Sequence, residues 1–333
     1  MERVHSLKNG GKLNEAIRTA QTAVDTARRL IETNPDQTLD LITSLELFGD
    51  LFRESDNYAD AESIYIEALE QTKTANSDNE QLARIKSSLA SVYDFNQYPE
   101  PAIALYQEAI ELFTKLDPPS ELDVANLRNN LGMLYKENEN FDSAEKNYMK
   151  SLEIFERILG QDNAELEVVY NNLGTLYYSS GFFAQAREMH EQALEIRENC
   201  THINSTDLGQ SYANLATTLH QLGNNEDALQ RYRKAISLLE NSLSNDRETF
   251  AIACSNYALL MRNLGKKRKA ISIEKRAQKL LRKKPKENLA SSYNNFTSNL
   301  SQESFSTEGA KLNALLMQIF VKSSRKPSSI SAR

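Results

Sequence analysis

Four asparagines recur at a fixed spacing through the centre of the chain. They stand 42 residues apart, at Asn130, Asn172, Asn214 and Asn256. A carboxamide offers two N–H donors and an acceptor oxygen, which match both hydrogen-bonding groups of a peptide bond without demanding a particular sequence. The same amides could instead hydrogen-bond a neighbouring helix or simply face water. The spacing therefore indicates a row of polar groups whose role depends on the elements that carry it.

The asparagines belong to a repeat that covers most of the chain. Two residues after each one comes a small residue, and the full series of small residues is Gly49, Ala90, Gly132, Gly174, Ala216 and Ala258. Twelve residues further on an alanine recurs at steps of 41 or 42 residues, at Ala61, Ala102, Ala144, Ala186, Ala228 and Ala270. In the two earlier repeats Leu47 and Ser88 replace the asparagine. Such a period predicts an array in which stacked neighbours share one continuous core.

Each repeat is expected to consist of two helices. In the repeat near residue 121, Val124, Leu127 and Leu131 share one helical face, as Ala144 and Tyr148 do in the following segment. Six complete repeats are predicted to begin near residues 38, 79, 121, 163, 205 and 247. The predicted organisation is a partial repeat over 1–36, six helix pairs over 37–284, capping helices and a linker over 285–322, and a disordered tail over 323–333.

Composition narrows the class of protein. The chain has 333 residues, 40% hydrophobic and 26% charged, and two cysteines without metal-ligand spacing. No apolar run reaches the length of a membrane span and no secretory signal is visible, so we expect a cytoplasmic protein with reduced thiols. Residues 1–261 carry 22 Lys/Arg and 42 Asp/Glu, whereas residues 262–333 carry 17 and 4. The sequence therefore has an acidic body and a basic end.

The register of small residue, aromatic and alanine resembles the tetratricopeptide repeat, whose usual period is about 34 residues. The 42-residue period and segments such as NNLGTLYYSSGFFAQAREMHEQALEIRE resemble the long repeats of kinesin light chains. The resemblance covers roughly residues 10–283 and implies an all-α, right-handed superhelix of antiparallel helix pairs. No segment resembles the heptad region of a kinesin light chain, so we do not expect a motor subunit.

The resemblance also implies where a ligand would lie. The first helix of each repeat lines a concave groove, where such asparagines hydrogen-bond the backbone of an extended peptide. Positions one helical turn away are added from helix geometry. Besides the four repeating asparagines, the predicted groove residues are Arg84, Asn126, Asn129, Lys136, Asn171, Tyr178, His220 and Arg262. The cation cluster that would grip a C-terminal carboxylate is not assembled, so an internal peptide or a partner helix is preferred.

A basic stretch follows the last of these residues. Its predicted patch comprises Lys266, Lys267, Arg268, Lys269, Lys275, Arg276, Lys279, Arg282, Lys283 and Lys284, with Glu274 as the acid among them. We expect these cations to stabilise the C-terminal end of a helix. They could form a solvated outer face, or bind an anionic protein or the acidic body of a second copy. Without aromatic interleaving or a nucleic-acid motif, nucleic acid is not an expected partner.

No catalytic motif or metal-ligand cluster is recognised, so we predict no enzyme activity, no cofactor and no metal. His190 takes the place of a core aromatic and is expected to be packed and hydrogen-bonded. The leading hypothesis is a protein-interaction adaptor whose groove holds a peptide segment or helix. The alternatives are a peptide-sensing receptor that changes its superhelical pitch, a self-assembling scaffold with oppositely charged ends, and an enzyme or an array fused to one.

Overall fold

The computed structural model describes residues 2–73, 75, 78–161, 163–200, 204–241 and 247–282. Of Pro35 and residues 280–282 only the backbone is described. The segments predicted as capping helices and tail, 285–322 and 323–333, lie outside the described residues, as do Lys283 and Lys284. The chain divides into two compact units at the end of the eighth helix, near Ile158. We refer to them as unit 1 and unit 2.

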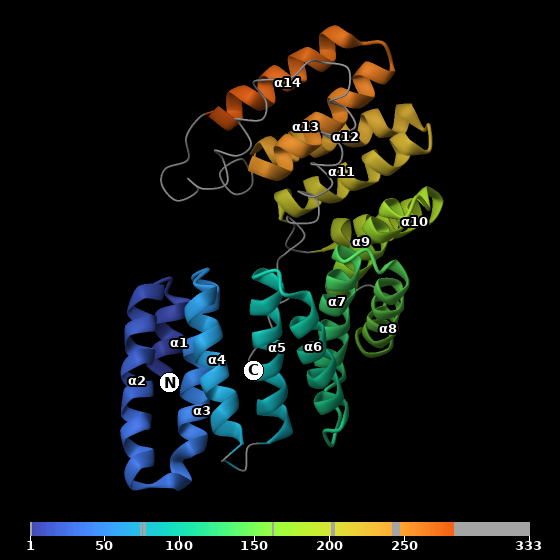
Figure 1. Ribbon diagram of the computed structural model, residues 1–333. Coiled ribbons are helices and arrows are strands. Elements are labelled where there is room, and N and C mark those ends of the chain that lie inside the picture. Colours follow the sequence, from blue (N-terminus) through green and yellow to red (C-terminus); the bar gives the residue numbers. More distant parts are fainter. Residues whose placement is uncertain are drawn as a thin grey trace. The chain divides into compact units, whose positions relative to one another are not determined.

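The described residues form fourteen α-helices and one short 3-10 helix, with no strand among them (Figure 1). Unit 1 contains α1 (Glu2–Asn9), α2 (Leu13–Thr33), η1 (Pro35–Gln37), α3 (Thr38–Glu54), α4 (Tyr58–Thr72), α5 (Asn79–Phe95), α6 (Pro99–Thr114), α7 (Glu121–Glu137) and α8 (Phe141–Leu159). Unit 2 contains α9 (Ala164–Ser179), α10 (Phe183–Asn199), α11 (Ser205–Gln221), α12 (Asn225–Asn241), α13 (Arg247–Asn263) and α14 (Lys267–Arg282). The predicted repeat starts agree within one residue with the starts of α3, α5, α7, α9, α11 and α13.

The repeating small residues and alanines set the distance between the two helices of a pair. All six repeating alanines are fully buried. A Cβ added at Gly132 would lie 2.7 Å from the ring of Tyr148, and one at Gly49 equally close to that of Tyr65. Glycine therefore lets a tyrosine of the second helix lie directly against the backbone of the first.

His190 occupies the same place against Gly174, where an added Cβ would lie 2.6 Å from the imidazole. The side chain is buried at 3% exposure, and burial lowers its pKa to about 3. The prediction of a packed histidine is confirmed. The prediction that it is hydrogen-bonded is wrong for Nδ1, which has no partner among the described residues.

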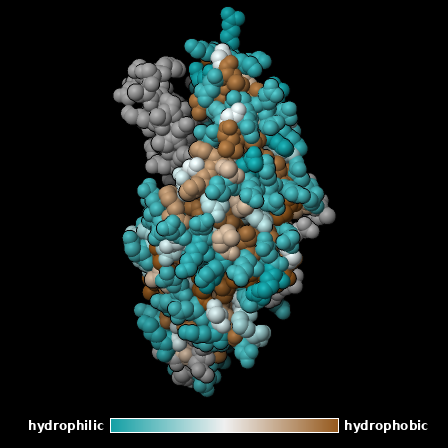
Figure 2. All heavy atoms as spheres, turned by 90° about the vertical axis from the view of Figure 1, so that its right-hand side faces the viewer, coloured by the Kyte–Doolittle hydropathy of each residue, from teal (hydrophilic) through white to brown (hydrophobic). Residues whose placement is uncertain are grey.

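The turns between paired helices also repeat. Each contains one residue with a left-handed backbone, and these residues are Asp56, Gln97, Glu139, Gly181, Gly223 and Gly265. Glycine adopts this conformation without strain, whereas a residue with a Cβ does so at a cost. On the face of the molecule drawn in Figure 2, hydrophilic residues predominate and hydrophobic residues are scattered between them.

Candidate functional site

The predicted groove residues are divided between the two units. In unit 2 the first helices of successive repeats, α9, α11 and α13, contact one another in sequence order. Amide, hydroxyl and imidazole side chains join these helices. We call this set the amide row, and it comprises Asn171, Tyr178, Asn214, Thr217, His220, Gln221, Asn256 and Asn263.

Two hydrogen bonds of the amide row join α9 to α11. Asn214 Nδ2 donates to Asn171 Oδ1 at 2.8 Å, and Gln221 Nε2 donates to the Tyr178 hydroxyl at 3.2 Å. The partners in each bond are 43 residues apart, which is about one repeat. Burial raises the pKa of Tyr178, whose hydroxyl therefore stays protonated at neutral pH.

Two further hydrogen bonds join α11 to α13. Asn256 Nδ2 donates to Thr217 Oγ1 at 3.4 Å, and Asn263 Nδ2 lies 2.9 Å from His220 Nε2. Burial lowers the pKa of His220, which keeps its imidazole neutral at physiological pH. An amide N–H bonded to Nε2 requires that nitrogen to be the acceptor. The amide row is therefore uncharged along its length.

Members of the row differ in how far they are covered. Asn171, Tyr178, His220 and Asn256 are partly exposed, and Gln221 and Asn263 are exposed. Asn214 is only 2% exposed, and its Oδ1 has no hydrogen-bond partner among the residues that the structure describes. The predicted residue Asn172 is equally buried. A ligand on this surface would meet the partly and fully exposed side chains directly. It would reach the buried amides of Asn172 and Asn214 only after side chains move.

Unit 1 holds the remaining predicted groove residues, and most of them are occupied or covered. Arg84 Nε donates to Glu46 at 2.8 Å and its Nη1 to Glu80 at 2.7 Å. Asn126 Nδ2 donates to a carbonyl of its own helix. Two more residues, Asn129 and Lys136, are 4% and 5% exposed, whereas Asn130 is partly exposed. The predicted row thus has different surroundings in the two units.

A buried ionic network in unit 2 was not anticipated from the sequence. Arg197 of α10 pairs with Glu167 of α9 and donates to the Asp207 carbonyl and the Ser211 hydroxyl of α11. Glu167 is 5% exposed, and burial raises its pKa to about 7 although the adjacent Arg197 lowers it. No repeating pattern marks these residues. The network joins α9, α10 and α11.

The basic patch lies largely on α14. Lys266, Lys267, Arg268, Lys269, Lys275, Arg276 and Lys279 are exposed, and the side chain of Arg282 is not described. Arg276 pairs with Glu240 of α12, and the predicted groove residue Arg262 grips Glu274 at 2.7 Å.

The expected helix-end stabilisation is wrong for three cations of the patch. Lys267, Arg268 and Lys269 occupy the first turn of α14, where the helix dipole disfavours positive charge. They therefore add no helix-end stabilisation and stand as an exposed cationic surface.

Among the described residues, no group of three His, Cys, Asp or Glu side chains is placed to hold a metal ion. None of the described helices is long and apolar enough to cross a membrane.

Comparison with solved structures places this arrangement among known folds. BtubC (BKLC) from P. vanneervenii matches with 31% identity and a TM-score of 0.60, over 70% of this chain and 93% of that one. A Podosopora anserina putative kinesin light chain with nearly identical TPR-like repeats matches with 17% identity and a TM-score of 0.53, over 63% and 100%. PilF of Pseudomonas aeruginosa matches with 18% identity and a TM-score of 0.52, over 78% and 97%. The latter two support the fold alone.

No match is found among curated proteins. The family model described as tetratricopeptide repeat matches residues 40–115, 123–199 and 207–283, which together make up more than half of the chain. The expected resemblance and the all-α solenoid of stacked helix pairs are both confirmed by these matches. The chain belongs to the tetratricopeptide repeat family.

Proposed function

We propose that this protein is a non-enzymatic adaptor that binds an extended segment of a partner protein on the amide row of unit 2. Repeat arrays of this kind present extended binding surfaces and bind proteins. The observation that carries the proposal is the set of hydrogen bonds that join α9, α11 and α13 through amides, all of which except Asn214 are partly or fully exposed. Neighbouring repeats thereby offer the same chemistry at regular intervals.

The chemistry of the row suits a peptide backbone. Asn171 can exchange its hydrogen bond with Asn214, and Asn256 its hydrogen bond with Thr217, for bonds to the N–H and C=O groups of an extended chain, at little net cost. Because Tyr178 and His220 are neutral, the row selects neither sign of charge. Arg262 is held by Glu274 and is not free to grip a terminal carboxylate. An internal segment therefore fits better than a chain end.

A second candidate function concerns the cations of α14. Lys266–Lys269, Lys275 and Lys279 have no ion-pair partner within the part of the chain that is described. Their charge complements the acidic body, so these residues are a candidate contact for an acidic protein or for a second copy of the chain. Oligomers formed in this way would dissociate as salt is raised, because exposed charges are screened over about 8–10 Å at physiological ionic strength.

The first experiment is a screen of an extended-peptide array with the full chain, followed by titration of the bound peptides. The test variant is Asn171→Ala/Asn256→Ala. The matched control is Gln185→Ala/Gln192→Ala, which removes two exposed amides from α10. Each hydrogen bond between the row and the peptide that is lost should cost about 0.5–1.5 kcal/mol of binding free energy, so the double variant should bind the peptide about tenfold more weakly.

The control variant should bind as the unaltered chain does, and affinity should respond little to salt because the row is uncharged. An unchanged affinity in a test variant of normal helicity would show that the amides serve only to join the repeats. Measuring mass by light scattering at low and high salt tests the second candidate separately.

A further inference from the structure

Three cations without an acidic partner gather where α7 meets the exposed face of α8 in unit 1. Lys146 and Lys150 lie one helical turn apart on α8, and both are exposed. Arg128 of α7 is half-buried, and its Nη1 donates to Asn147 Oδ1 of α8 at 3.4 Å. None of the three cations has an ion-pair partner among the described residues. We call Arg128, Lys146 and Lys150 the cation triad, and none of them is a predicted groove residue.

Other repeats show that the arginine of the triad and Lys150 hold neighbouring positions. One repeat earlier the two positions hold Lys86 and Glu108, which form an ion pair. Two repeats later they hold Tyr212 and Lys234, and the ammonium lies 4.2 Å from the centre of the tyrosine ring. Because the helix pairs share one register, two cations meet in the triad where other repeats hold an oppositely charged pair or a cation on an aromatic ring.

The acid that pairs with the same position of the second helix in later repeats is also missing here. Lys234 pairs with Glu198 of the preceding second helix at 3.2 Å, and Arg276 pairs with Glu240 in the same way. In the repeat of the triad, the equivalent neighbour on α6 is the exposed Thr114. Both acids that neutralise these positions elsewhere are therefore replaced, one by a lysine and one by a threonine.

The arginine of the triad is prepared to bind an anion. Burial lowers the pKa of Arg128, because its charge loses water and gains no carboxylate in exchange. Its hydrogen bond goes to the neutral amide of Asn147, so further N–H groups of the guanidinium can donate to a ligand. A phosphorylated side chain carries a charge of about −1.5 to −2 and three acceptor oxygens, and a guanidinium binds two of these at once.

The surface beside the triad favours a phosphorylated side chain over a free phosphate ion. Met149 stands between the two lysines in the sequence and is 47% exposed, although it is large and apolar. An apolar residue next to a phosphorylated one can pack on this side chain, a contact that a free ion does not make. We propose that the cation triad binds a phosphoserine or phosphothreonine of a partner protein, with Arg128 as the principal donor. This site is independent of the amide row.

The probe is a library of short peptides that carry phosphoserine between varied neighbours, titrated with the full chain by fluorescence anisotropy at physiological ionic strength. Matched libraries carry serine or glutamate in its place, and inorganic phosphate is tested as a competitor. The phosphoserine library should bind about tenfold or more tightly than the serine library, with apolar neighbours enriched. Glutamate peptides and inorganic phosphate should bind more weakly than phosphoserine peptides. Arg128→Gln should weaken phosphopeptide binding about tenfold, since charge-assisted hydrogen bonds are lost.

Lys150→Glu separates binding from folding. It recreates the oppositely charged pair of the preceding repeat, so the variant should keep its helicity and its unfolding midpoint while it loses phosphopeptide binding. The matched control is Arg233→Gln, which removes from α12 an exposed arginine that has no ion-pair partner among the described residues. This control and the double variant of the amide row should both bind phosphopeptides as the unaltered chain does.

Far-UV circular dichroism reports whether the helices of each variant remain. Three results would overturn the proposal: equal binding of the serine and phosphoserine libraries, phosphopeptide binding that survives both Arg128→Gln and Lys150→Glu in folded variants, or inorganic phosphate that binds as tightly as the phosphopeptides.

Discussion

The turn residues of the repeats allow the cost of a left-handed backbone to be measured twice in one chain. Glu139 and Gly181 occupy equivalent turns in successive repeats, with φ values of 58° and 81°. A Cβ added at Gly181 would meet nothing within 4 Å. Replacement by alanine there therefore introduces no steric contact beyond the backbone itself. The reciprocal change, Glu139→Gly, should relieve the same strain.

The expected change in the free energy of unfolding follows from two opposing effects. A left-handed backbone costs a residue with a Cβ about 1–2 kcal/mol relative to glycine. Alanine in place of glycine restricts the unfolded chain and returns about 0.4–1 kcal/mol. Gly181→Ala should therefore lower the free energy of unfolding by about 1 kcal/mol. Glu139→Gly should raise it by a similar or smaller amount.

Thermal unfolding followed by circular dichroism would detect these changes, since 1 kcal/mol shifts the midpoint of a unit of this size by about 2–4 °C. Hydrogen exchange of the helices flanking each turn would localise the effect. Glu139→Asn is the intermediate control, because asparagine tolerates the left-handed region better than glutamate. The reasoning is refuted if Glu139→Gly destabilises the protein or if Gly181→Ala leaves its stability unchanged.

Three further predictions concern buried groups. Tyr148→Phe should leave the free energy of unfolding unchanged or raise it, because the buried hydroxyl has no partner within the described part of the chain. Tyr65→Phe should lower the free energy of unfolding by about 1–2 kcal/mol through loss of a 2.6 Å hydrogen bond to Asp50, as urea titration would show. The pKa of Glu167 is raised to about 7, so this residue contributes its full stabilisation below about pH 4.5 and loses it as the pH rises to 7. The free energy of unfolding of Glu167→Gln, compared with that of the unaltered chain across that range, should isolate a change of up to about 3 kcal/mol. Parallel pH profiles of the two proteins would contradict this prediction. Burial raises the pKa of the Cys254 thiol to about 12, so iodoacetamide should label Cys200 first, as mass spectrometry of the native protein can check; equal labelling rates would contradict the burial of Cys254.

The fold was largely predictable because small residues recur in the sequence with the period of the repeat. Small residues such as Gly132 and alanines such as Ala144 are required wherever two helices pack closely, so they recur at each repeat and mark the helix pairs. The division into two units was not predictable in this way. The repeat register continues through the end of α8, and no change of composition marks that position.

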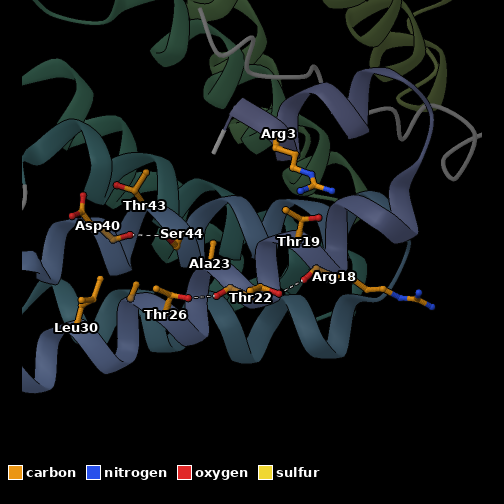
Figure 3. A pocket seen from close by; sticks show the side chains of 11 residues that line it. Arg3, Arg18, Thr19, Thr22, Ala23, Thr26, Leu30, Asp40, Thr43 and Ser44 are labelled. Atoms are coloured by element: carbon orange, nitrogen blue, oxygen red, sulfur yellow. Dashed lines mark hydrogen bonds between the residues drawn. The ribbon is translucent and has the colours of Figure 1, made fainter.

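The candidate site was only partly predictable. Register fixes the direction in which an asparagine leaves its helix, but the side chains of the adjacent repeat decide how far it is covered. Asn256 is therefore partly exposed while Asn214 is 2% exposed, although both hold the same position. A pocket lined by Thr19, Thr22 and Thr26 of α2 and by Thr43 of α3 (Figure 3) was not predicted, although Thr43 holds the same repeat position as Arg84 and Asn126. Its available signal was the spacing of Thr19, Thr22 and Thr26, which places three hydroxyls on one helical face.

The bonds between repeats also bear on how the chain folds. They connect residues close to one repeat apart, as in Asn171–Asn214 at 43 positions and Glu46–Arg84 at 38. Separations of this size are only about a tenth of the chain length, so the bonds between repeats are local in sequence, as in other helical proteins of low contact order. Each repeat needs only its neighbour to complete its contacts. During synthesis on the ribosome, a repeat can therefore reach its native packing once the following one has emerged.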